Sequence, residues 1–121
     1  MAEIFATGGA PLLNPASGGI KLPQETLERL VASILGAVEA EEIYVFGSYA
    51  RGEQTPDSDV DVFIVSEDDS PRAVALVGME LRWLKMHVDI VMERRALFDL
   101  GKTRFGLVER EVGMEGVKIY G

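Results

Sequence analysis

Cysteine is absent from the 121 residues and histidine occurs once, as His87. Without cysteine the chain has no disulfide framework, no thiol nucleophile and no thiolate metal site, and a single histidine excludes a His-rich one. No apolar run approaches the roughly 18 residues of a membrane span. The N-terminus also lacks the basic region of a signal peptide. These absences predict a soluble cytoplasmic protein with no membrane association.

Basic residues are scarce as well, since 12 Lys and Arg oppose 20 Asp and Glu, for a formal net charge of −8. Nucleic-acid binding needs a basic face that displaces counterions from phosphates, so we expect no direct nucleic-acid binding. A polyanionic ligand would need metal ions or a local group of arginines. The length is that of one domain, at about 150 residues per domain.

The first 22 residues carry two Gly-Gly pairs and two prolines, which interrupt regular structure. This composition predicts a flexible N-terminal arm over residues 1–22 and a folded domain over residues 23–121. An arm that becomes ordered on a partner is the alternative.

Two kinds of apolar pattern alternate along the domain. Apolar residues at helical spacing predict helices, and short β-prone runs predict strands. The expected helices cover residues 23–38, 70–84 and 96–112, and the expected strands cover residues 43–46, 59–65, 88–92 and 117–120. This order predicts an α/β (α+β) fold, with a small mixed sheet of three to four strands and helices packed on one side.

Gly47-Ser48 follows the first expected strand and precedes a short helical turn. A glycine lets the backbone approach a ligand closely. The serine hydroxyl and the free N–H groups of a helix start form an anion site suited to phosphate. An ordinary N-cap serine after a turn glycine is the alternative, and Gly-Ser alone does not separate the two.

Asp59 and Asp61 share one face of the second expected strand, with Cα atoms about 6.6 Å apart at a rise of about 3.3 Å per residue. Asp89 interrupts the third strand and joins the pair if the two strands are neighbours with aligned faces. Carboxylates brought together repel each other unless a cation lies between them, and Mg²⁺ prefers such oxygen ligands. The pattern therefore favours a two-metal site for displacement at phosphorus. A solvated strand face, or for Asp89 a place at the sheet edge, is the alternative.

The spacing of Gly47-Ser48, ten residues, and then Asp59-x-Asp61 resembles the signature of the DNA polymerase β-like nucleotidyltransferases. The string GSYARGEQTPDSDVDVFIV is similar to their minimal nucleotidyltransferase branch. The resemblance covers roughly residues 24–120 and implies the nucleotidyltransferase fold.

The same resemblance implies roles for individual residues. Gly47 and Ser48 would hold the β,γ-phosphates of a nucleoside triphosphate. Asp59 and Asp61 would bind two Mg²⁺ ions. Asp89 would bind the catalytic ion and accept the proton of the acceptor. For Arg51, which lies in the Ala-Arg-Gly after Gly-Ser, both a phosphate contact and a salt bridge that holds the loop are open.

Members of this branch are often paired with a HEPN-domain protein in toxin–antitoxin modules, and some add AMP to a tyrosine of that partner. The resemblance thus implies a Mg²⁺-dependent nucleotidyltransferase that moves AMP from ATP to a hydroxyl, most simply a tyrosine of a HEPN-type toxin, and so acts as antitoxin. The acceptor surface would come from this partner or from a homo-oligomer. A non-catalytic antitoxin that acts by nucleotide or partner binding, and transfer to a small molecule such as an aminoglycoside, are the alternatives.

His87 lies two residues before Asp89 and could tune the site or contact the base or the acceptor. A single histidine at a helix–strand junction is more often a cap or a surface residue, and the sequence alone does not choose between these roles.

Overall fold

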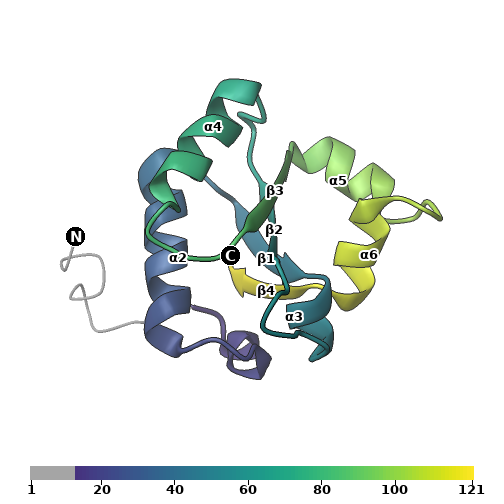
Figure 1. Ribbon diagram of the computed structural model, residues 1–121. Helices are drawn as coiled ribbons and strands as arrows, with labels where there is room; N and C mark the ends of the chain where they lie inside the picture. The colour runs from purple at the N-terminus through teal and green to yellow at the C-terminus, as the bar shows by residue number, and fades with distance from the viewer. Residues whose placement is uncertain (1–12) are drawn as a thin grey trace.

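The structure is a computed structural model that describes residues 13–121, with a central four-stranded sheet between two layers of helices (Figure 1). The helices are η1 (Pro15–Gly19), α2 (Gln24–Ala37), α3 (Ser48–Arg51), α4 (Pro71–Glu80), α5 (Arg95–Gly101) and α6 (Val108–Glu115). The strands are β1 (Glu42–Phe46), β2 (Val60–Val65), β3 (Val88–Glu93) and β4 (Val117–Tyr120).

The strand order is β3-β2-β1-β4, and the sheet is mixed, as the sequence predicts. β1 pairs antiparallel with both β2 and β4. β2 and β3 are parallel and are joined through α4, since parallel neighbours need a crossover connection. The α+β class and the small mixed sheet are thereby confirmed.

Helices cover both faces of the sheet, so the expectation of helices on one side is wrong. In Figure 1, α2 and α4 lie on one face and α5 and α6 on the other. Val60, Val62 and Ile64 of β2 belong to the core beneath α2 and α4, while Phe63 and Val65 pack with Phe98 and Val112 of the opposite helices. β2 is therefore buried on both faces, which its continuous apolar run from Val62 to Val65 already indicates.

The helix expected over residues 96–112 is divided into α5 and α6. A turn follows Gly101, and Gly106 adopts a positive φ of 81°, a conformation that glycine tolerates best. The interruption lets both short helices place an apolar side chain on the sheet. Over residues 13–121, no helix is long and apolar enough to cross a membrane.

Residues 13–22 pack against the domain, which therefore extends to Leu13 instead of beginning at Pro23. Leu13 and Ile20 are 8% and 4% exposed, and the Asn14 backbone N–H donates a 2.8 Å hydrogen bond to the Ile119 carbonyl of β4. Pro15 and the Gly-Gly pair exclude a long helix here but permit the short 3₁₀ helix η1. The remainder of the expected arm, residues 1–12, lies outside the described residues.

Candidate active site

The pairing of β2 with β3 brings three aspartates to one edge of the sheet. Asp61 lies directly opposite Asp89 in the parallel register, and Asp59 immediately precedes β2. Because side chains alternate along a strand, Val60 and Val62 face the core on the other side and fix which way the acids point. The condition on which the sequence prediction depended, neighbouring strands with aligned faces, is met.

Asp61 and Asp89 are close enough to hydrogen bond. Burial raises the pKa of Asp61 to about 6, and the contact with Asp89 and the negative charges of Asp89, Asp59 and Glu111 act in the same direction. Two carboxylates in this position need a shared proton or a cation between them. The pair is therefore chemically suited to a divalent ion.

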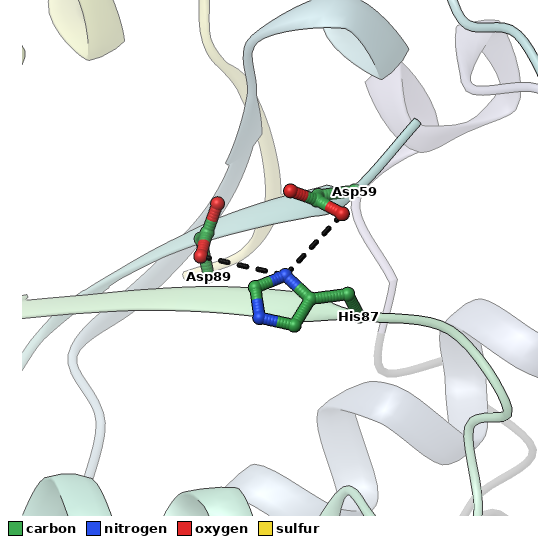
Figure 2. Close-up of side chains that lie close together, drawn as sticks. All are labelled: Asp59, His87 and Asp89. Carbon is green, nitrogen blue, oxygen red and sulfur yellow. Dashed lines mark ion pairs between the residues drawn. The ribbon is translucent and has the colours of Figure 1, made fainter. Parts of the chain in front are cut away.

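His87 lies between the carboxylates of Asp59 and Asp89 (Figure 2). Its Nδ1 is 3.3 Å from an oxygen of Asp59 and 3.6 Å from an oxygen of Asp89. The Val60 N–H donates a 3.0 Å hydrogen bond to the His87 carbonyl, which starts the β2–β3 ladder and fixes the imidazole beside Asp59. The three side chains are partly exposed, with 45% for Asp59, 68% for His87 and 52% for Asp89, so solvent and ligands reach them.

Gly47 and Ser48 lie against this cluster because β1 pairs with β2. Phe46 is opposite Asp61, so Gly47 follows beside the Asp61 carboxylate, and Ser48 begins α3. Gly47 has φ 70° and ψ −148°, and a β-carbon added to it would collide with Oδ2 of Asp61. Only glycine meets both requirements at this position. The two halves of the sequence motif are thus packed against each other.

Arg51 forms ion pairs with three glutamates. Its guanidinium is 2.8 Å from Glu53, 3.4 Å from Glu111 and 3.8 Å from Glu115. The contacts with Glu111 and Glu115 join α3 to α6, and the first of them spans 60 residues of sequence. They correspond to the salt bridge that the sequence left open, whereas a phosphate contact of Arg51 is still a prediction.

Sequence reasoning missed Glu111, whose charge acts on both Asp61 and Arg51. No local sequence pattern predicts this role, because Glu111 reaches the site only through the packing of α6. For His87 the signal was its spacing of two from Asp89, which on a strand places both side chains on one face.

Comparison with known proteins gives a consistent set of matches. A family model described as a nucleotidyltransferase domain matches residues 26–112. The protein MJ0604 of Methanocaldococcus jannaschii, named as a candidate protein adenylyltransferase, is 30% identical over 79 residues, which cover 65% of this chain and 77% of that protein. The protein adenylyltransferase MntA of Thermococcus cleftensis is 38% identical over 65 residues. That match spans 51% of this chain and 65% of MntA, slightly less than two thirds of its length.

Solved structures of toxin–antitoxin proteins share the fold. A toxin–antitoxin structure with AMP-PNP gives a TM-score of 0.61 at 24% identity, over 78% of this chain and 73% of the other. A mutant of the toxin–antitoxin MntA-HpeT gives 0.60 at 22% identity, with the same coverage. At this level of identity the likeness concerns the arrangement of helices and strands.

Proposed function

This chain belongs to the nucleotidyltransferase domain family, and on that premise we propose that it transfers AMP from ATP to a hydroxyl of a partner protein, with release of pyrophosphate. The observation that carries the proposal is the β2–β3 register, which places Asp89 beside Asp61 at the point where Gly47 packs on the same carboxylate. One small region of the sheet thus combines an acidic cluster with a glycine-serine turn.

The carboxylates of the site suit Mg²⁺ chemically, and the proposal assigns them two ions. Asp59, Asp61 and Asp89 supply hard oxygen ligands, and the raised pKa of Asp61 follows from burial and from crowding with Asp89, an arrangement that a divalent cation relieves. These three aspartates would hold the ions. When bound, the ions supply neutralisation of triphosphate charge and stabilisation of the charge that develops on reaction.

The chain's own side chains divide the remaining tasks. Gly47 and Ser48 bind the β,γ-phosphates at the start of α3, where the missing β-carbon of Gly47 lets the backbone pack directly on the Asp61 carboxylate. Asp89 accepts the proton of the attacking hydroxyl, because its carboxylate is half-exposed and lies beside Asp61. These residues hold the nucleotide so that the acceptor hydroxyl is in line with the bond that breaks. Such positioning lowers the barrier to nucleotidyl transfer.

The acceptor in this proposal is a tyrosine of a HEPN-type toxin, so that the chain acts as antitoxin. The relatives' names, protein adenylyltransferase, and the toxin–antitoxin origin of the similar structures support it. A surface on α6 and the preceding turn, which we call the α6 surface, exposes Phe105 by 86%, Met114 by 70% and Leu107 by 44%. Exposed apolar side chains gathered in this way are typical of protein-binding sites.

The α6 surface is linked to the acidic cluster through Glu111, and this link favours the acceptor protein as its occupant. Glu111 lines the groove beside Met114 and also acts electrostatically on Asp61. A partner seated there has its acceptor side chain close to the proposed site.

The test is transfer of labelled AMP in the presence of Mg²⁺ and a HEPN-type protein supplied as the acceptor. Wild-type protein is expected to label the partner. Asp59→Asn and Asp61→Asn are each expected to lose about 10³-fold in rate, since loss of a metal-ligand charge removes several kcal/mol of transition-state stabilisation.

The matched control is Asp57→Asn, which changes an exposed aspartate two residues before Asp59 and should label the partner at the wild-type rate. Labelling that persists in both Asp59→Asn and Asp61→Asn contradicts the proposal. Tight partner binding without any nucleotide binding would instead favour the non-catalytic antitoxin.

A further inference from the structure

His87 lies beside the three aspartates and has no role in the reaction proposed above. The imidazole of His87 presents Nδ1 to the same carboxylates, from the same face of the sheet, and is the only imidazole in the chain. Its ring is 68% exposed, so packing does not require it to be there. The contacts that define its position are those with Asp59 and Asp89 (Figure 2).

The spacing of these three side chains is that of ligands around one ion. Two ligand atoms at about 2.1 Å from a cation are about 3.0 Å apart in an octahedral site and about 3.4 Å apart in a tetrahedral one. The Nδ1 of His87 is 3.3 Å and 3.6 Å from the two carboxylate oxygens, and one ligand atom from each residue lies within 4.8 Å of the others. A small change in side-chain torsions would centre all three on one ion.

We propose that His87 is a ligand of the metal centre, together with Asp59 and Asp89, and that this nitrogen makes the centre bind divalent transition metals in preference to Mg²⁺. The inference rests on the proposed function insofar as both use the same carboxylates. Mg²⁺ takes oxygen ligands and retains its waters, whereas an imidazole suits Fe²⁺, Ni²⁺, Cu²⁺ and Zn²⁺, with Mn²⁺ at the weak end of the same affinity series.

The exposure of the ring supports this role. A neutral imidazole that turns its Nδ1 lone pair to a cation keeps its Nε2–H in water, so ligation buries no unsatisfied donor. His87 immediately precedes β3, and its spacing of two from Asp89 continues the alternation of the strand, which sets the ring on the same face as that carboxylate. The backbone bond from Val60 to the His87 carbonyl holds it beside Asp59.

Pulsed electron paramagnetic resonance of tag-free protein with Mn²⁺ and no nucleotide tests the proposal directly. Wild-type protein is expected to show imidazole-nitrogen modulation of the Mn²⁺ signal. Because the chain has no second histidine, that signal can come from His87 alone. Wild-type protein that binds Mn²⁺ without nitrogen modulation overturns the proposal.

Metal titrations give the second readout. His87→Gln is expected to weaken Mn²⁺ binding about tenfold or more, on the scale of losses around metal sites, and to change Mg²⁺ affinity less than about twofold when measured by competition. Lys85→Gln, an exposed change in the same connection between α4 and β3, is expected to leave Mn²⁺ affinity within about twofold. Equal losses for Mn²⁺ and Mg²⁺ in His87→Gln, or an equal loss of Mn²⁺ binding in Lys85→Gln, overturn the proposal.

The outcome is separable from that of the proposed function. AMP transfer by wild-type protein with Mg²⁺ tests the enzyme without reference to His87, while nitrogen coordination is read with no nucleotide present. AMP transfer without nitrogen coordination contradicts only the proposal that His87 is a metal ligand. Nitrogen coordination without AMP transfer contradicts only the proposed transferase activity.

Discussion

β3 carries a crowded carboxylate at each end, and the two ends differ in what surrounds it. At its start Asp89 contacts Asp61, and at its end Glu93 contacts Glu109 of α6. Burial and the neighbouring carboxylate raise the pKa of Asp61 to about 6 and that of Glu93 to about 7. By charge alone the two ends look alike.

Their surroundings separate them. The Asp89 end is open, with half-exposed carboxylates, the imidazole of His87 and the Gly47 turn against it. At the Glu93 end, Oε2 of Glu93 is buried and has no hydrogen-bond partner among the described residues, while the adjacent Arg94 is 3.8 Å from Asp69. A raised carboxyl pKa therefore does not identify a site by itself. Access and the adjacent Gly47-Ser48 turn distinguish one acid pair from the other.

The largest effect expected is on catalysis when the two ends are mutated in parallel. Asp89→Asn should lower AMP transfer by about 10³-fold, because it removes the carboxylate proposed as metal ligand and proton acceptor. Glu93→Gln, on the same strand and face, should stay within about twofold of wild type. Radiolabel transfer to the partner measures the activity of both variants. Comparable losses in the two would contradict the conclusion that only the Asp89 end of β3 forms the site.

A second expected effect isolates the glycine turn. Gly47→Ala should lose about 10²-fold in transfer and about 1–3 kcal/mol in stability, because alanine is strained at this φ and its methyl group collides with Asp61. Gly52→Ala is the control, since Gly52 has φ 71° but open space around an added β-carbon. It should lose only about 1 kcal/mol, with transfer retained. Thermal unfolding and transfer assays check the pair, and equal loss of activity in both variants would speak against a role of the turn in the site.

A smaller effect is expected for Arg51, which decides between its two interpretations. If Arg51 holds α3 to α6 through Glu111 and Glu115, Arg51→Ala should lower the transfer rate less than about tenfold and leave the KM for ATP unchanged. A rise of KM for ATP by more than about tenfold would instead assign Arg51 to the phosphates.

The smallest effect is the pH dependence of stability at the Glu93 end. The pKa of Glu93 is raised from 4.5 to about 7, so the folded state retains a proton that the unfolded state releases, and stability falls as pH rises through 7. Between pH 6 and pH 8 the unfolding free energy should fall by about 1 kcal/mol, after allowance for solvent screening.

Glu93→Gln should flatten this pH slope, whereas Glu39→Gln, at an exposed position after α2, should keep it. Denaturant titrations at the two pH values provide the measurement. An unchanged slope in Glu93→Gln would place the titrating group elsewhere in the chain.

The acidic cluster was predictable because strand periodicity is a strong signal. The two-residue spacing of Asp59 and Asp61 and the single acid of the third strand left one unknown, the adjacency of the strands, and the β2–β3 pairing resolves it. The placement of α5 and α6 was misjudged, although Phe63 and Val65 on the acidic face indicated that something covers them.

Other features depend on contacts that no local pattern encodes. The pair between Arg51 and Glu111 spans 60 residues, and Glu111 looks like any other charge on an amphipathic helix. His87 shares a face with Asp89 by spacing, but its contact with Asp59 requires the β2–β3 ladder. The packing of Leu13 and Ile20 against the domain was hidden by Pro15 and the two glycines between them.

The segment Leu13–Ile20 also protects one border of the sheet. β4 is an outermost strand, and the Asn14 backbone occupies its Ile119 carbonyl while the Asn14 side chain donates to the Gly121 carbonyl. Border strands with unpaired backbone groups recruit strands from other molecules. A version of this protein trimmed to begin at Pro23 would lose this cover, and its molecules would tend to pair through β4. Work on a shortened chain should therefore preserve everything from residue 13 onward.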